Sequence, residues 1–289
     1  MSGTTSSAAR IGGAETAGGG PNPMGWLRAW NGMMAVARYE VVRSLTPWRI
    51  ALWLAMVVFP VLLVGTVAYN LRRSPQLPPD VEVAYTMILF VLLPEVVTVL
   101  GMLLWATPVV SSELEGQTWI YALVRPGGRR SVLLGKYLVA VLWTASCGVL
   151  SVSLALPLTG MDNGFQVWWV LVVLCLLSSI AHGALFAFLG VMFQRRIMVV
   201  AFIYAIIVEA LLGWIPAVIN KFTVAYRLRS LLFQWLELPI PADMRSSELF
   251  TDGTSAWVHV ACLVGGAVVL LGIASWRIGR AQYSFQSEV

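Results

Sequence analysis

The chain has 289 residues, of which 58% are hydrophobic and only 11% are Asp, Glu, Lys or Arg, and its net charge is +5. This composition excludes an ordinary soluble domain, in which about a quarter of the residues are charged. Runs of about 18 or more apolar residues predict transmembrane helices, because about 20 residues cross a ~30 Å hydrocarbon layer. We therefore predict an all-α, multi-pass membrane protein. The positive charge indicates membrane topology, and no nucleic-acid binding is expected.

The chain begins with two segments that precede the predicted membrane domain. Residues 1–25 are rich in Gly, Ser, Thr and Ala and lack the apolar stretch of a secretory signal peptide, so we expect a flexible cytoplasmic tail. Residues 26–46 form an amphipathic pattern that predicts a helix on the membrane surface. Its apolar positions are Leu27, Trp30, Met34, Ala37, Val41 and Leu45.

For residues 47–289 the sequence predicts one transmembrane domain with six spans. We expect the spans at about 49–71, 84–110, 134–158, 167–193, 197–219 and 257–276. With both termini in the cytoplasm, roughly two thirds of the 19 Lys and Arg residues lie inside, as the positive-inside rule favours. The pair Arg72-Arg73 is an exception to this distribution.

The longest predicted outer loop, residues 220–256, contains a second amphipathic pattern before the last span. Leu228, Leu231, Leu232 and Trp235 follow the spacing i, i+3, i+4, i+7, which is typical of a helix. Pro239 and Pro241 follow this pattern and stop it. We predict a short helix that lies on the outer leaflet or dips into it.

The connector between the second and third spans is a charged segment between two long apolar segments. Ser112, Glu113 and Glu115 precede the apolar run 118–124, and an Arg- and Gly-rich turn at 125–130 follows. Acidic residues at a helix N-terminus complement the helix dipole. We predict a short helix at about 111–124 across the cytoplasmic mouth of the bundle, with a plain solvated connector as the alternative.

The same residues resemble a known family signature. Glu113-x-Glu115-Gly116-x-Thr118, followed by Arg125-Pro126, Arg129 and Gly135-Lys136, is similar to the pattern of ATP-binding cassette (ABC) transporter permeases of the type-2 exporter family. In that family an E-x-x-G-x-T segment follows the second span and leads through a short helix to an RP-x-x-R turn and a GK pair. Gly127-Gly128 depart from the bulkier residues usual in that turn.

The resemblance implies that this chain is the transmembrane subunit of an exporter in the plasma (cytoplasmic) membrane. It implies a second permease subunit, identical or different, and separate cytoplasmic ATPase subunits that bind ATP and Mg. The connector would be a coupling helix that docks on the ATPase, and the surface helix would be a second contact. By the resemblance, the docking residues are Glu113, Glu115, Gly116, Thr118, Tyr121 and Arg125.

The sequence itself contains no nucleotide-binding loop. A phosphate-binding loop needs G-x-x-x-x-G-K-[ST] between a strand and a helix. Upstream of Gly135-Lys136 the required Gly is Arg130, and Tyr137 follows the Lys. Catalytic, cofactor and metal motifs are also missing from the sequence, so we do not expect an enzyme, and ATP hydrolysis is assigned to a partner chain.

Three ionisable residues, Glu95, His182 and Glu209, fall near the middle of predicted spans. A charge at a helix centre costs about 2.5–3.5 kcal/mol on insertion scales, so such residues face an interior and find partners. They are interpreted either as a hydrogen-bonded structural cluster or as a proton relay or substrate contact. The second interpretation leads to an alternative function, a proton-coupled secondary transporter. A non-transporting membrane scaffold subunit is a further alternative.

Overall fold

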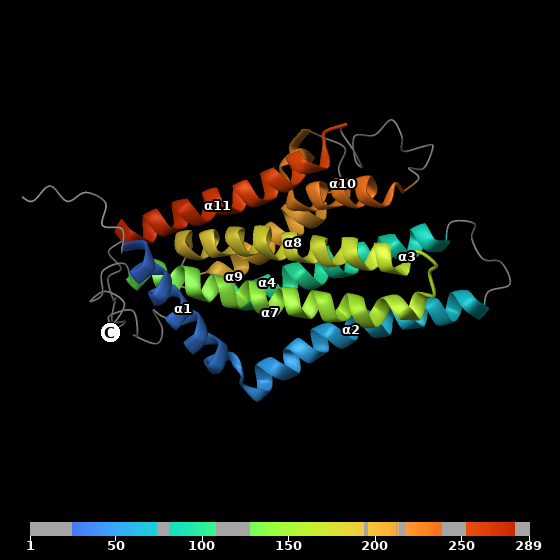
Figure 1. The fold of residues 1–289 in the computed structure, drawn as a ribbon, viewed down its shortest axis with the longest axis horizontal. Helices are drawn as coiled ribbons and strands as arrows, with labels where there is room; N and C mark the ends of the chain where they lie inside the picture. Colours follow the sequence, from blue (N-terminus) through green and yellow to red (C-terminus); the bar gives the residue numbers. More distant parts are fainter. Residues whose placement is uncertain are drawn as a thin grey trace, which may run out of the picture.

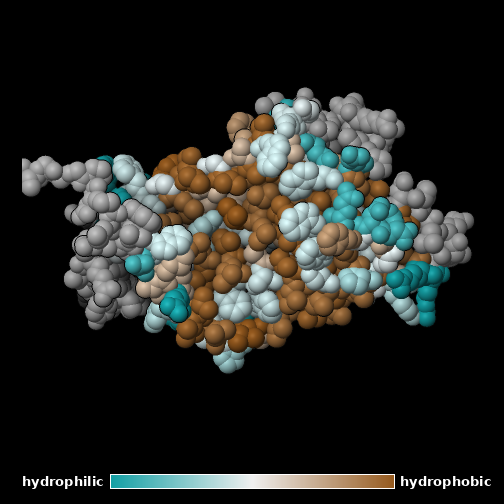
Figure 2. Space-filling view, in the orientation of Figure 1, coloured by the Kyte–Doolittle hydropathy of each residue, from teal (hydrophilic) through white to brown (hydrophobic). Residues whose placement is uncertain are grey.

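The structure is a computed structural model that describes residues 25–73, 81–107, 128–193, 196–211, 213, 218–238 and 253–280. Within these ranges every regular element is a helix, and five helices are long and apolar enough to cross a membrane. Hydrophobic residues dominate the middle of the face shown in Figure 2, and hydrophilic residues gather toward its ends. The predicted all-helical, multi-pass character is therefore confirmed, whereas the tail before Gly25 lies outside the described residues.

The five long helices lie side by side along the molecule (Figure 1). In α8, 78% of the most apolar 18-residue stretch is buried, against 17% in α2 and 22% in α11. α8 is therefore the centre of the bundle, packed against α7, α11, α10 and α4. The five are α2 (Pro47–Arg73), the continuous helix of α3 (Val81–Phe90), η1 (Val91–Val97) and α4 (Thr98–Trp105), α7 (Gly128–Thr159), α8 (Gly164–Met192) and α11 (Ala256–Arg280).

The fifth predicted span, 197–219, differs in the structure. α9 (Ile197–Tyr204) continues into the π-helix η2 (Ala205–Leu211), and the apolar helix then ends. At 1.5 Å per residue this helix is about 22 Å long, too short for a ~30 Å hydrocarbon layer. The sequence contains a physical reason, because Gly213 and Pro216 follow, and both residue types weaken a helix, proline by removing a backbone donor.

The chain resumes as a short 3₁₀ helix, η4 (Val218–Phe222), and the α-helix α10 (Val224–Leu236). Leu228, Leu231 and Leu232 are buried, so the apolar face of α10 packs on α8 and α11. α10 therefore packs within the protein, on the two helices beside it, and part of its polar face is buried as well. In Figure 1, α9 occupies the left part of the bundle and α10 the right part.

The helix α1 (Gly25–Ser44) lies obliquely to the bundle and packs on α7, as Figure 1 shows. A Cβ atom at Gly135 of α7 would lie 2.9 Å from the Met33 carbonyl oxygen and 2.9 Å from Val36 Cγ1. A larger residue would push the helices apart, so Gly135 is what permits this close contact. Tyr39 and Val42, farther along α1, are exposed.

Candidate functional site

The connector predicted to bind an ATPase lies outside the described residues, which omit 108–127. Its expected docking residues therefore remain predictions from the sequence. They are Glu113, Glu115, Gly116, Thr118, Tyr121 and Arg125.

The two ends that flank this connector are described, and both are packed into the bundle. Where α4 ends, the Thr107 carbonyl oxygen lies close to α8, 3.2 Å from where a Cβ at Gly190 would sit. Where α7 begins, the Arg129 guanidinium donates to the carbonyl oxygens of Ile278 at 3.3 Å and Gly279 at 3.5 Å. Arg129 thus holds the last carbonyls of α11, a position that the helix dipole favours for a cation.

The three ionisable residues predicted at mid-span come together in one place. Glu95, His182 and Glu209 all line a cavity of about 220 Å³. His182 lies on α8, Glu95 on η1 and Glu209 on η2, so three separate helical segments contribute. The structure thus brings the three residues together in one site.

Both carboxyl groups are carried by π-helical segments, which the sequence analysis did not anticipate. A π-helix bonds each N–H to the carbonyl five residues earlier, and such segments occur often at functional sites. Pro94 lies within η1 and has no N–H to give. Two side chains hold the carbonyls there: Thr98 Oγ1 donates to Leu93 O at 3.0 Å and Ser178 Oγ donates to Pro94 O at 2.6 Å.

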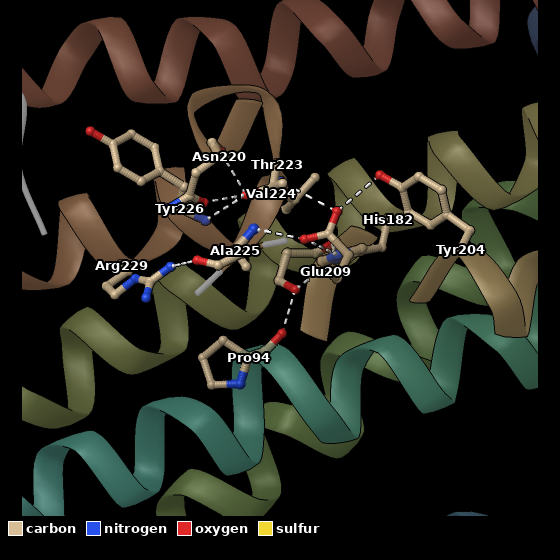
Figure 3. A network of polar contacts seen from close by, with 12 residues as sticks. Pro94, His182, Tyr204, Glu209, Asn220, Thr223, Val224, Ala225, Tyr226 and Arg229 are labelled. Atoms are coloured by element: carbon tan, nitrogen blue, oxygen red, sulfur yellow. Dashed lines mark hydrogen bonds and ion pairs between the residues drawn. The ribbon is translucent and has the colours of Figure 1, made fainter. Parts of the chain in front are cut away.

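Glu209 has many partners and its carboxyl group faces the N-terminus of α10 (Figure 3). Oε2 accepts from the Ala225 N–H at 2.9 Å. Oε1 accepts from the Tyr204 hydroxyl at 3.0 Å and from the Val224 N–H at 3.4 Å. With Thr223 Oγ1 accepting from Tyr226 N at 3.2 Å, the first three N–H groups of α10 are all satisfied. Glu209 therefore fastens the end of η2 to the start of α10.

His182 is 1% exposed and its two ring nitrogens differ. Nδ1 lies 3.1 Å from the Ser178 carbonyl oxygen, which can only accept, so Nδ1 carries the hydrogen. Nε2 lies 3.8 Å from Glu209 Oε2, beyond hydrogen-bond distance. Within the described part of the chain, Nε2 has no hydrogen-bond partner. A neutral His182 therefore presents an unused acceptor at the cavity.

Glu95 contrasts with Glu209. Its side chain is only partly buried, and its Oε1 has no hydrogen-bond partner among the described residues. No described hydrogen bond ties its carboxyl group to a helix terminus. The two carboxyl groups that the sequence grouped together thus have different environments.

The sequence analysis missed Arg229, which is fully buried in α10. Its Nη2 donates to the Gly213 carbonyl oxygen, so it holds the break between η2 and α10 (Figure 3). The charges of Arg229 and Glu95 are close enough to attract each other. A signal existed: Arg229 lies three positions from both Tyr226 and Leu232, inside the apolar arc of the helix. Tyr204 was also missed, because a Tyr in an apolar run carries no distinctive pattern.

Comparisons with known proteins do not assign the chain to a family. The sequence matches no protein-family model and no curated protein.

Proposed function

We propose that this chain is the transmembrane permease subunit of an ATP-driven exporter of the ATP-binding cassette type. The observation that carries the proposal is the connector signature, from Glu113 through Thr118 to Gly135-Lys136, joined to a membrane domain of long apolar helices. Hydrolysis of ATP would occur in a separate cytoplasmic ATPase. A second permease subunit would complete the transport path in the plasma membrane, with both termini of this chain cytoplasmic.

The packing of the residues that flank the connector supports a mechanical role. Arg129 ties the start of α7 to the end of α11, and Gly135 lets α1 lie directly on α7. Tightly packed helices move as rigid bodies. A displacement of the connector by a partner would therefore pass to α7, α1 and α11 together.

A cluster of aromatic rings at the end of α4, on the other side of the connector, also supports a mechanical role. Trp105, at the end of α4, stacks on Trp143 of α7 with ring centroids 5.7 Å apart, and Arg49 lies over the Trp105 ring at 5.4 Å. The end of α4 is thus connected to α7 and to the start of α2. Both ends of the connector reach the same group of helices, which suits a coupling segment.

A second candidate function, a proton-coupled secondary transporter, is favoured by a different observation. Glu95, His182 and Glu209 share one cavity at span depth, and two of the three have an acceptor atom without a described partner. Glu209, however, is held in place by three donors. Only Glu95 and His182 would then transfer protons, so the relay would consist of two groups.

Purification of the chain from its native membrane tests the proposal. We expect an ATPase with its own nucleotide-binding loop to co-purify. The variant Glu113→Lys with Glu115→Lys should reach the membrane normally and lose the ATPase, because positive charge opposes both the helix dipole and a basic groove. The matched control, Glu113→Asp with Glu115→Asp, keeps the charge and should retain the ATPase. If the Lys variant holds its ATPase and transports normally, the connector is only a solvated loop.

A further inference from the structure

The cavity that contains Glu95 and His182 is open on an apolar side. Its rim includes Val96, Leu100 and Phe202, which are 38%, 45% and 54% exposed. The rim residues belong to η1, α4 and α9, and their exposed side chains face away from the bundle. In a membrane, a ligand that reaches this opening from the hydrocarbon layer must carry an apolar part.

The polar end of the cavity offers acceptors. In the neutral form of His182, Nδ1 donates to the Ser178 carbonyl and Nε2 keeps its lone pair. Nε2 has no described hydrogen-bond partner and lies 3.8 Å from Glu209 Oε2. Glu95 Oε1 has none among the described residues either. Buried polar atoms are almost always hydrogen-bonded, so two unused acceptors at one cavity point to a missing donor.

The charges around the cavity point to a cation. Glu95 and Glu209 contribute two carboxyl groups, and Arg229 contributes one guanidinium group that acts on Glu95. Among the described residues of this site, two carboxyl groups are thus accompanied by one permanent positive charge, that of Arg229, while His182 Nε2 lies 3.8 Å from Glu209 Oε2. Buried charges are stabilised by a partner of opposite sign. A ligand with one positive charge and several N–H groups satisfies both requirements.

We propose that this cavity binds the primary ammonium group of an amphipathic molecule, with the ammonium between Glu95 and His182 and the apolar chain along the rim. An ammonium group has three donors and no acceptor, which matches two unused acceptors. The volume of about 220 Å³ equals that of roughly seven water molecules, enough for the head group and the first carbons of a chain. The inference requires no ATPase and goes beyond the proposed function, so either can fail without the other.

A ligand series on the purified full chain in nonionic micelles tests the inference without any mutation. Dodecylamine, dodecyltrimethylammonium and dodecanol share one chain and differ in their heads. We measure the concentration at which each produces a saturable rise in the thermal unfolding midpoint. Dodecylamine should act at about tenfold lower concentration than dodecyltrimethylammonium, because hydrogen bonds to charged groups are worth that factor or more. Equal potency of the two cations, or of dodecanol, would overturn the proposal.

The variant Glu95→Gln tests whether the Glu95 carboxyl group binds the ammonium group. It keeps the shape of the side chain and removes its charge, so the advantage of dodecylamine over dodecyltrimethylammonium should disappear. Glu82→Gln is the matched control, because Glu82 is exposed on α3, directly upstream in the same continuous helix, and is absent from the cavity lining. It should bind dodecylamine as the wild type does. If a folded Glu95→Gln variant binds dodecylamine as the wild type does, Glu95 does not bind the ammonium group and the proposal is wrong. If that variant does not fold, the ligand series on the wild-type chain tests the proposal by itself.

Nanodiscs distinguish two sources of the ammonium group. The same titration is repeated in phosphatidylcholine discs and in discs in which part of the lipid is phosphatidylethanolamine, which has a primary ammonium head. A rise in the dodecylamine concentration needed would identify the aminophospholipid as the occupant. An unchanged concentration would identify a single-chain amine. Loss of the dodecylamine preference in both kinds of disc would contradict the inference.

Discussion

Two regions of the bundle use polar side chains in opposite ways. At the elbow between α1 and α2, Trp143 Nε1 donates to Ser44 Oγ at 2.8 Å, and Ser44 Oγ donates to Val41 O at 2.7 Å. Trp53 Nε1 donates to the Trp143 carbonyl at 3.1 Å. At the cavity, His182 Nε2 and Glu95 Oε1 have no described partner. The elbow satisfies its polar groups internally, which stabilises one arrangement, whereas the cavity keeps unused acceptors, as a binding site does.

The same contrast exists within the cavity, between its two carboxyl groups. Glu209 accepts from three donors and joins η2 to α10, whereas Glu95 Oε1 makes no described hydrogen bond. A place in the same cavity therefore does not imply the same role. One acid belongs to the scaffold and the other is open to a ligand. The following variants test that division, and all are compared by the midpoint of unfolding in mixed micelles.

The largest effect is expected for Glu209→Ala. The change leaves the N–H groups of Val224 and Ala225 and the Tyr204 hydroxyl without their acceptor in a buried place. Removal of one partner from a buried charged network costs about 3 kcal/mol or more. We expect a strongly lowered unfolding midpoint and an early loss of protection of α10 in hydrogen exchange. Wild-type stability of this variant would show that Glu209 does not hold the two segments together.

The next effect concerns the elbow. Trp143→Phe removes the indole N–H that Ser44 accepts and part of the stack on Trp105. The expected cost is about 1–2 kcal/mol, from one hydrogen bond and one aromatic contact. Trp257→Phe is the control, since Trp257 is 80% exposed, and its cost should be near zero. Equal losses in both variants would mean that the elbow contacts add nothing specific.

A smaller effect is expected at the start of α10. Thr223→Ala removes the side chain that accepts from Tyr226 N, and the loss of such an N-cap costs about 1 kcal/mol. Thr223→Ser keeps the hydroxyl and should be close to wild type. Because Glu209 still holds the two preceding N–H groups, the Ala variant should remain folded. A loss as large as that of Glu209→Ala would show that Thr223, and not the carboxyl group, is the main cap.

The sequence was sufficient to predict the long helices, because a run of about twenty apolar residues in a bilayer must form a helix to satisfy its backbone hydrogen bonds. It also grouped Glu95, His182 and Glu209 by their expected depth, since each helix rises by a fixed amount per residue, and in the structure the three line one cavity. A full span at 197–219 was not confirmed, because the described apolar helix ends at Leu211. Gly213 and Pro216 follow in the sequence, and both are helix-breaking signals. The π-helices were missed because they depend on contacts between segments far apart in sequence, such as that of Ser178 with Pro94. Arg229 was missed although its place in the apolar arc of α10 was a signal.

The smallest change in stability is expected for Glu95→Gln, and this variant separates the two acids most directly. Gln replaces a carboxyl oxygen by an amide of the same size, and Glu95 Oε1 has no described hydrogen bond to lose. We expect a small loss of stability, because the variant breaks no described hydrogen bond and removes only the attraction between Glu95 and Arg229. Glu209→Gln, the same chemical change, replaces one of two accepting oxygens by an NH₂ group that faces donors, so it should cost clearly more. If both variants lose the same stability, the two carboxyl groups form one structural cluster, and Glu95 is not free to receive a ligand.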